Sequence, residues 1–516
     1  MNLPQFKPVV LIVLDGVGIA RNGPGNAVKQ AKTPYLESLW SSFPSTSLIA
    51  SGEDVGLPAG VKGNSEVGHL NLGCGQIVYQ ELPRINKSIK NGSYYINNEF
   101  YAAFIHSQKN KSKIHVVVCF SKGSVHGTID HLTAFLESAK KAEVKQEVII
   151  HAFTDGRDSP PKSAAIFFNQ IDQTIHRLQL GKFGTIIGRY WAMDRNRLWD
   201  RTKIAYDSLV HGKGTNEPNW KNALQKAYEN GETDEFIKPI IINNSNDTRV
   251  KDGDSFIFLN YRADRAIQLT RALVEAAFSE FERGEFLSNL YFVGMSQYAK
   301  GIPEHIAYPK ENIDIPLGRL ISESDKRQLR ISESEKFPHV TYFFNGGRSV
   351  KFEGEDRLEI PSPSVSTYDK MPEMSLFEVT EVINQKLALN IYDFILLNIA
   401  NGDMVGHTGN IKAGKIAMEA VDLCVRKIVK SVTAFGGVAL ITADHGNIEE
   451  MLNTETGLVD TEHSSNPVPF ILVPPIRYTQ KILLKTGILS DVSPTIIELM
   501  DLTRPSSMVR SSLIRN

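Results

Sequence analysis

The sequence has few cysteines and no excess of either charge. Its 516 residues include only Cys74, Cys119 and Cys424, which are widely separated and form no Cys-x-x-Cys pair. This spacing excludes a disulfide framework and a thiolate metal site, so we expect a reduced, cytoplasmic protein. Lysine and arginine total 57, aspartate and glutamate 58, and the formal charge is −1. Because nucleic-acid-binding proteins usually have a basic excess, no nucleic-acid partner is expected.

Long apolar runs are also absent. No stretch approaches the ~18 consecutive apolar residues that a membrane-spanning helix needs. The first apolar run, residues 9–14, is short and ends at Asp15, so we expect neither a secretory signal nor a membrane partner. A composition of 41% hydrophobic and 22% charged residues is ordinary for a globular protein, and the length predicts two or three domains.

Short apolar runs rich in β-branched and aromatic residues recur along the chain, separated by polar stretches long enough for helices. This alternation predicts an α/β protein with mostly parallel sheets covered by helices on both faces. The predicted strands lie at 9–14, 114–120, 147–153, 184–188, 255–260, 290–294, 340–344, 393–400, 437–443 and 470–474.

The stretch VKGNSEVGHLNLGCGQ, residues 61–76, is dense in glycine and has few residues typical of a helix or a strand core. We interpret it as a loop, since glycine-rich loops occur where the backbone turns sharply or approaches a ligand. Ser65 lies within it. Taken alone, the stretch is better explained as a surface turn with an incidental serine.

Carboxylates and imidazoles stand next to the ends of four apolar runs, where ligands bind in open α/β sheets. Such ligands, without thiolates, suit Mn²⁺, Zn²⁺ or Mg²⁺, and there are enough of them for two ions. Two ions can stabilise the attacking and leaving oxygens of a phosphoryl displacement, and a coordinated Ser65 would become a nucleophile. Taken singly, each carboxylate also fits a helix cap. The residues are Asp15, Asp403, His407, Asp444, His445 and His463.

The middle of the chain carries arginines at or just after three predicted strands. Arginine binds carboxylates and phosphates through two parallel hydrogen bonds, so the pattern predicts a pocket for a small anion. The alternative is surface arginines paired with nearby aspartates. The five are Arg157, Arg189, Arg195, Arg262 and Arg265.

Four motifs occur in the order GNSEVGHLNLG, NGDMVGHTG, TADHGN and HSSNPVP, after a strand that ends in Asp-Gly. With these motifs the chain resembles, over essentially its whole length, the cofactor-independent (2,3-bisphosphoglycerate-independent) phosphoglycerate mutases of the alkaline-phosphatase-like metalloenzyme superfamily. The resemblance implies an isomerase of glycolysis and gluconeogenesis that interconverts 3-phosphoglycerate and 2-phosphoglycerate through a phosphoserine. It also implies two Mn²⁺ ions, no 2,3-bisphosphoglycerate and a monomer.

The resemblance further implies roles for individual residues. One ion would be held by Asp403, His407 and His463, and the other by Asp15, Ser65, Asp444 and His445. Asp158 would move protons at the glycerate hydroxyls, with His126 as the alternative, whereas Glu66 and His69 match no ligand position. The implied substrate-binding residues are His126, Arg157, Asp158, Arg189, Arg195, Arg262, Arg265 and Lys336.

The candidate metal ligands lie at both ends of the chain and the arginines between them, which predicts one domain inserted into another. Breaks near 80 and 310 predict one domain of residues 1–79 and 311–516 and an inserted domain of residues 80–310. The resemblance implies that the first is an alkaline-phosphatase-like metal-binding domain and the second a substrate-binding (transferase) domain. A metal-dependent phosphomonoesterase, or a mutase of another sugar phosphate, would share the metal motifs but not GRYWAMDR and YRADR. A binding protein on the same scaffold would lack the nucleophile or a ligand, and none is missing.

Overall fold

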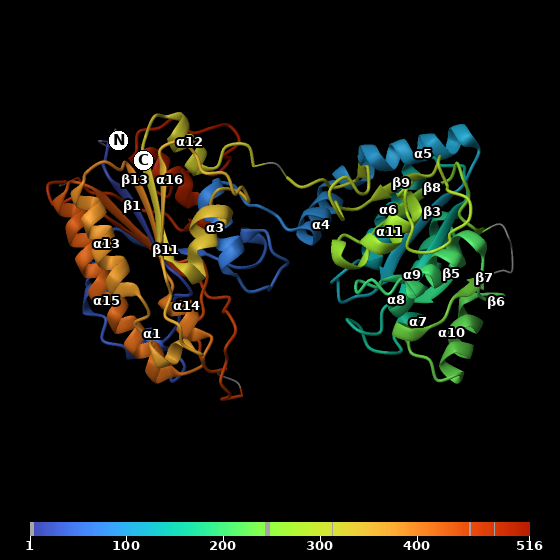
Figure 1. Cartoon of the computed structure of the whole chain (residues 1–516), viewed down its shortest axis with the longest axis horizontal. Helices are drawn as coiled ribbons and strands as arrows, with labels where there is room; N and C mark the ends of the chain where they lie inside the picture. Colours follow the sequence, from blue (N-terminus) through green and yellow to red (C-terminus); the bar gives the residue numbers. More distant parts are fainter. Residues whose placement is uncertain (1–4, 243–247, 312, 454–455, 479, 516) are drawn as a thin grey trace. The chain divides into compact units, whose positions relative to one another are not determined.

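A computed structural model describes residues 5–242, 248–311, 313–453, 456–478 and 480–515. The chain divides into two compact units (Figure 1). The first unit combines Met1–Gln80 with Asn312–Asn516, and the second is the continuous segment Glu81–Glu311. No helix in the described ranges combines the length and the apolar character that crossing a membrane would require.

The first unit is built on a mixed sheet with the strand order β12-β11-β13-β1-β14-β15-β2-β16. Strand β1 is central and pairs in parallel with β13 and with β14, so that Val13 lies opposite both Asn398 and Thr442. Strands β11 and β12 extend the parallel part, and β15 is antiparallel to β14 and β2. The strands are β1 Val9–Leu14, β2 Ser45–Ile49, β11 Gln328–Glu333, β12 Glu355–Ile360, β13 Phe394–Ile399, β14 Val438–Thr442, β15 Val468–Val473 and β16 Gly487–Ile488.

Helices lie on both sides of this sheet, with α13 and α15 on one side and α3 and α12 on the other in Figure 1. In α15 the buried residues Val421, Val425, Ile428 and Val432 recur at helical spacing and form the stripe that packs inward. The helices are α1 Ala27–Gln30, α2 Pro34–Ser42, α3 Ser65–Cys74, α12 Leu317–Glu323, α13 Leu376–Ala388, α14 Asn401–Gly406, α15 Ile411–Ala434 and α16 Val492–Leu499.

The second unit has its own sheet, with the order β10-β9-β8-β3-β4-β5-β7-β6. All neighbouring pairs are parallel except β5 and β7. The central strands β3 and β4 are buried at every residue, as expected for parallel strands covered on both faces. The strands are β3 Ile114–Phe120, β4 Val148–Thr154, β5 Lys182–Gly188, β6 Thr215–Glu217, β7 Ile240–Ile242, β8 Ser255–Phe258, β9 Tyr291–Gly294 and β10 His305–Ile306.

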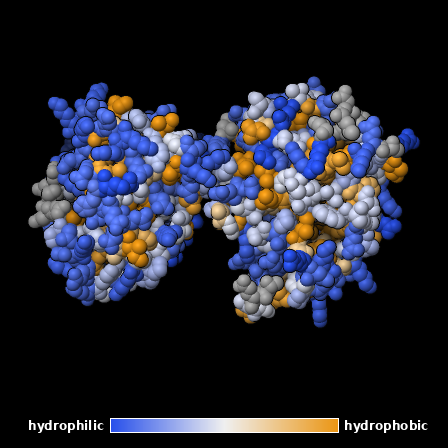
Figure 2. Space-filling view, turned by 180° about the vertical axis from the view of Figure 1, so that it is seen from behind, coloured by the Kyte–Doolittle hydropathy of each residue, from blue (hydrophilic) through white to orange (hydrophobic). Residues whose placement is uncertain are grey.

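Amphipathic helices surround this second sheet. Their polar sides face outward, and Figure 2 shows a largely hydrophilic surface broken by small hydrophobic areas. The helices are α4 Glu81–Asn91, α5 Asn98–Asn110, α6 Ile129–Lys141, α7 Ala164–Leu178, α8 Arg189–Ala192, α9 Trp199–Tyr206, α10 Trp220–Glu229 and α11 Ile267–Val274.

The α/β prediction is confirmed, but the strand predicted at 340–344 is wrong. That run lies in a π-helical turn, η8, which spans His339–Phe343. Val340 and Phe344 are buried four residues apart, whereas Tyr342 between them is 40% exposed, a helical rather than an alternating pattern. A short apolar run cannot be assigned to a strand or a helix from periodicity alone.

The loop predicted around Ser65 is also wrong, because residues Ser65–Cys74 form helix α3. The side chain of Asn64 caps the helix by accepting a hydrogen bond from the Val67 amide at 3.0 Å. The glycines allow close packing rather than a flexible loop. A Cβ on Gly68 would lie 2.7 Å from the Asp444 carbonyl oxygen, and one on Gly73 would lie 2.0 Å from the Phe344 carbonyl oxygen.

Candidate metal centre and anion site

The predicted metal ligands gather at the carboxyl ends of the parallel strands of the first unit. Asp15 follows β1, Asp444 and His445 follow β14, and Asp403 lies on α14 just after β13. Because these strands are adjacent and parallel, their ends meet at one edge of the sheet. His463 reaches the same place from the segment before β15.

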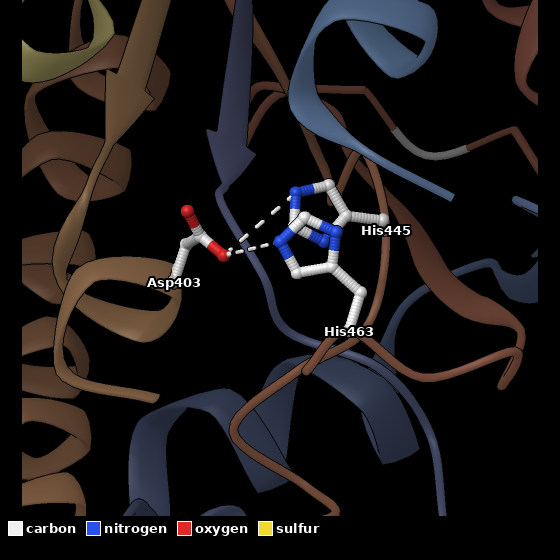
Figure 3. Close-up of side chains that lie close together, drawn as sticks. All are labelled: Asp403, His445 and His463. Carbon is white, nitrogen blue, oxygen red and sulfur yellow. Dashed lines mark ion pairs between the residues drawn. The ribbon is translucent and has the colours of Figure 1, made fainter. Parts of the chain in front are cut away.

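The ligand atoms form two adjoining groups. Those of Asp15, Asp444 and His445 lie within 4.8 Å of one another, and so do those of Asp403, His445 and His463. Figure 3 shows the second group, with both imidazoles beside the Asp403 carboxylate. His445 belongs to both groups, because its Nε2 is 3.6 Å from Asp15 Oδ1 and 3.9 Å from Asp403 Oδ1.

His407 also lies against the second group. Its Nε2 is 3.2 Å from Asp403 Oδ1 and 3.1 Å from His463 Nε2. It follows α14 directly, and the spacing of four residues puts it on the same side as Asp403. The resemblance implied that His445 binds only the ion of the first group. In the structure its ring also stacks on that of His463 in the second group, with centroids 4.0 Å apart.

Ser65 is the first residue of α3 and is 6% exposed. Its hydroxyl donates to Asp15 Oδ1 at 3.2 Å, and its Oγ is 2.9 Å from His445 Nε2. A hydroxyl at a helix N-terminus lies in the positive end of the helix dipole, which favours a negatively charged group at this position. Ser65 therefore sits where a bound phosphoryl group would be stabilised.

Lys336 lies in the metal cluster rather than among the arginines. It follows β11, its side chain is nearly fully buried, and its Nζ is 2.8 Å from Ser65 Oγ. The same ammonium is 2.8 Å from Asp15 Oδ1 and 2.6 Å from Asp403 Oδ2. A group predicted to bind substrate is thus in direct contact with the proposed nucleophile.

The three buried carboxylates have different electrostatic environments. Burial and the neighbouring Asp444 raise the pKa of Asp15. At Asp403 burial acts in the same direction, but Lys336 and the neighbouring histidines together outweigh it, and the pKa falls well below the usual range. The pKa of Asp444 is also lowered, because His445 and other neighbouring charges outweigh burial. The carboxylates in turn raise the pKa of Lys336 despite its burial.

These residues fit a divalent cation. The candidate ligands are carboxylate oxygens, imidazole nitrogens and one hydroxyl, which hard and borderline metals prefer. Asp444 Oδ2 is fully buried and accepts no hydrogen bond among the described residues, although His69 Nδ1 and His445 Nε2 lie 3.2 and 3.5 Å away. Three buried carboxylates face one ammonium group, so the cluster requires further positive charge.

The predicted anion-binding residues of the second unit gather at the carboxyl ends of β3, β4, β5 and β8. Arg157 and Asp158 follow β4, and Arg189 is the first residue of α8, directly after β5. His126 lies between β3 and α6, and Arg195 follows α8. Arg262 and Arg265 border the short helix η6, Ala263–Arg265, after β8.

Ion pairs link most of these residues. The buried Arg189 donates hydrogen bonds from its Nη1 both to Asp158 and to Asp155 Oδ1, the latter at 2.5 Å. His126 lies between two carboxylates, with Nε2 3.9 Å from Asp158 Oδ2 and Nδ1 3.6 Å from Asp264 Oδ1. Burial and the nearby Arg189 lower the pKa of His126 to about 4, so the imidazole is neutral at physiological pH.

The remaining arginines are more exposed. Arg195 donates to Asp264 Oδ2 at 2.9 Å, and Arg262 Nε is 3.2 Å from Asp264 Oδ1. Arg265 donates to the Met193 carbonyl at 2.9 Å, and burial together with Arg189 and other arginines lowers its pKa. Arg157 is the outermost, 54% exposed and 3.7 Å from Glu235. Several guanidinium groups held by carboxylates form a site suited to a polyanion.

Sequence reasoning missed several residues of these clusters. Asp155 and Asp264 pair with Arg189 and Arg195 of the second unit. Asp155 stands two residues before Arg157, and Asp264 stands within the motif YRADR. Asn447 donates to Asp403 Oδ1 at 3.0 Å and stands in TADHGN. Asn398 donates to Asp15 Oδ2 at 2.6 Å, and its only sequence signal is a polar residue within an apolar run.

The α/β fold and the carboxylate–imidazole cluster define a metal-dependent enzyme, and comparison with known proteins agrees. A family model described as the metalloenzyme superfamily matches residues 7–504. Curated relatives named 2,3-bisphosphoglycerate-independent phosphoglycerate mutase include those of Clostridioides difficile and Moorella thermoacetica. The first is 46% identical over 98% of this chain and 99% of its own, and the second 46% over 100% and 99%.

A solved phosphoglycerate mutase of Leishmania mexicana, studied at low cobalt concentration, is 29% identical. It covers 100% of this chain and 98% of its own, with a TM-score of 0.56. The chain belongs to the 2,3-bisphosphoglycerate-independent phosphoglycerate mutase family of the metalloenzyme superfamily. The family and the two ligand groups together indicate dependence on a divalent metal.

Proposed function

We propose that the protein interconverts 3-phosphoglycerate and 2-phosphoglycerate, as an isomerase of glycolysis and gluconeogenesis that needs no 2,3-bisphosphoglycerate. The observation that carries this proposal is the environment of Ser65. Its buried hydroxyl contacts Asp15, His445 and Lys336 in a chain whose full-length relatives are named as such mutases. A serine in that environment is suited to accept a phosphoryl group.

The proposed metal centre holds two divalent ions. One ion is bound by Asp403, His407 and His463, and the other by Asp15, Ser65, Asp444 and His445. Bound there, the ions would supply positive charge to the phosphoryl oxygens and favour the deprotonated serine. Mn²⁺ is the proposed metal. Zn²⁺ generally binds such ligands more tightly, so cellular availability rather than affinity would select Mn²⁺.

The proposed reaction passes through a phosphoserine. Ser65 Oγ attacks the phosphorus of the substrate, the bond from phosphorus to the glycerate oxygen breaks, and that oxygen takes up a proton. Lys336, in contact with Ser65 Oγ, stabilises the negative charge of the phosphoryl group during transfer. The other glycerate hydroxyl then loses its proton and attacks the phosphoserine, which releases the isomeric product and regenerates the serine.

The residues of the second unit bind the substrate in this proposal. Arg157, Arg189, Arg195, Arg262 and Arg265 pair with its carboxylate and phosphate oxygens, which suits guanidinium groups. Asp158, hydrogen-bonded to Arg189, exchanges the proton at the glycerate hydroxyls, and His126 is the alternative.

The remaining parts of the proposal concern the whole chain. Residues 1–79 and 311–516 form the phosphatase-like, metal-binding domain, and residues 80–310 form the substrate-binding (transferase) domain. The chain acts as a monomer on a small-molecule substrate, without a nucleic-acid partner, and a glycolytic reaction places it in the cytoplasm.

The test is to incubate the purified protein with 3-phosphoglycerate and Mn²⁺ and without 2,3-bisphosphoglycerate. Formation of 2-phosphoglycerate, followed by ³¹P NMR and abolished by a chelator, is the expected result. Release of inorganic phosphate without isomerisation would instead identify a phosphomonoesterase. Binding of substrate with no turnover would indicate a non-catalytic protein on the same scaffold.

A further inference from the structure

We infer that His69 and Asn398 are positioning residues for the metal centre: together they hold the carboxylates of Asp15 and Asp444 and thereby set the affinity for divalent metal. The inference rests on the proposed function only in requiring that this centre binds metal. Neither residue is among the proposed ligands, and the motif around Ser65 left His69 without a role.

His69 lies on α3 one turn after Ser65, and its side chain is fully buried. Its Nδ1 is 2.9 Å from the Ser65 carbonyl oxygen and 3.2 Å from Asp444 Oδ2. The imidazole therefore lies between the backbone of the proposed nucleophile and the far oxygen of a proposed ligand. A movement of the ring would displace both.

Asn398 approaches the other ring nitrogen from β13. It is 1% exposed, and its Nδ2 is 3.0 Å from His69 Nε2 and 2.6 Å from Asp15 Oδ2. An amide nitrogen carries two hydrogens and only donates, so it donates one to each partner. His69 Nε2 must then accept, which leaves the ring hydrogen on Nδ1, where it is donated to the Ser65 carbonyl oxygen, and Asp444 Oδ2 lies 3.2 Å from the same nitrogen.

These contacts form one continuous path from Asp15 through Asn398 and His69 to Asp444. It joins four separate elements: the end of β1, strand β13, helix α3 and the segment after β14. At Asp15 the path occupies Oδ2, and Oδ1 is left facing Ser65 and other proposed ligands. Groups that orient metal ligands from behind usually change metal affinity by about 10–100-fold when they are removed.

Burial alone does not explain why His69 and Asn398 contact the carboxylates of the metal centre. Helix α3 carries another buried polar residue, Asn71, whose hydrogen bonds go to backbone carbonyl oxygens instead. Asn71 is fully buried, and its amide donates to the carbonyl oxygens of Val55 and Val67, both at 2.9 Å. It stabilises the packing of α3 without touching a carboxylate of the centre. Asn71 is therefore the matched control for a merely structural role.

The experiment measures binding of Mn²⁺ alone to the full-length protein, by equilibrium dialysis and elemental analysis. We expect His69→Leu and Asn398→Leu to weaken binding about 10–100-fold. His69→Asn, which returns an amide donor near the Nδ1 position, should recover part of the loss. Asn71→Leu should lower the thermal stability of the metal-free protein, measured in the presence of a chelator, and leave its Mn²⁺ affinity at the wild-type value.

The outcomes separate the inference from the proposed function. Wild-type affinity in folded His69→Leu or Asn398→Leu, or an equal loss in Asn71→Leu, would overturn the inference while the proposed function stands. His69→Asn replaces the leucine variants if they do not fold, because the shorter asparagine side chain loses the contact with Asn398. Wild-type Mn²⁺ affinity in His69→Asn would then overturn the inference. A wild-type protein that binds no Mn²⁺ would overturn both. Normal binding without mutase activity would overturn only the proposed function.

Discussion

Replacing Lys336 by methionine tests whether the carboxylates of the first unit depend on positive charge. Methionine keeps most of the length of the side chain and removes the ammonium. The lysine Nζ lies 2.8 Å from Asp15 Oδ1 and 2.6 Å from Asp403 Oδ2, within the buried metal cluster. In the metal-free protein the substitution leaves both carboxylates without their nearest cation.

The magnitude follows from the burial of these groups. Removing one partner of a buried ion pair costs about 3–5 kcal/mol of the free energy of unfolding. For a unit of this size that corresponds to a fall in Tm of about 10 °C. Because bound divalent ions would supply the missing charge, we expect a much smaller fall when Mn²⁺ is present.

The Tm of the wild type and of Lys336→Met is measured by near-ultraviolet circular dichroism during heating. Each protein is measured once in chelator and once in Mn²⁺. Lys62→Met is the control, since Lys62 forms an exposed pair with Glu462 at 3.0 Å. Such surface pairs contribute only ~0–1 kcal/mol, with or without metal. A fall in the Tm of Lys336→Met that is equal in the two conditions would refute the charge-balance reasoning.

Three further predictions concern other residues. Ser65→Ala should abolish mutase activity without unfolding the protein, and full activity in a coupled assay would refute the proposed nucleophile. Burial raises the pKa of Glu333 to about 7, so its contribution to stability is complete below the ordinary glutamate pKa and is lost as pH rises through about 7. Glu333→Gln should therefore stabilise the protein at pH 8, by up to ~3 kcal/mol, but not at pH 4, and denaturation curves that shift equally at both would contradict this. Arg195→Ala should raise KM at least about 10-fold, because hydrogen bonds to charged groups contribute ~1.5–3 kcal/mol. The control Arg177→Ala, which removes a surface pair with Glu137, should leave KM unchanged. Equal KM values in the two variants would contradict a substrate role for Arg195.

The parallel strands and the residues that follow them could be predicted from the sequence. The run VVLIVL is apolar throughout because both faces of a central parallel strand are covered, and the first polar residue, Asp15, marks the edge of the sheet. For Asp15, Asp403 and Asp444 this edge is also the place where the structure brings the carboxylates together.

The remaining features depend on contacts that local patterns do not encode. The helix at Ser65–Cys74 is dense in glycine, and packing against Asp444 and Phe344 decides its structure rather than intrinsic propensity. Lys336 reaches Ser65 across 271 positions of the chain, so no local motif reveals the contact. Asn398 is a single amide in an apolar strand, and only the register of β13 against β1 shows its partner.

The central position of β1 has a consequence for synthesis on the ribosome. Residues Val9–Leu14 are among the first to be made, but one partner strand begins only at Phe394 and the other at Val438. At ~5–20 residues per second, this apolar segment waits roughly 20–80 s for its first neighbour. The second unit, a continuous segment made in that interval, can fold first. The yield of active protein should therefore depend on what shields residues 9–14 while the chain is still growing.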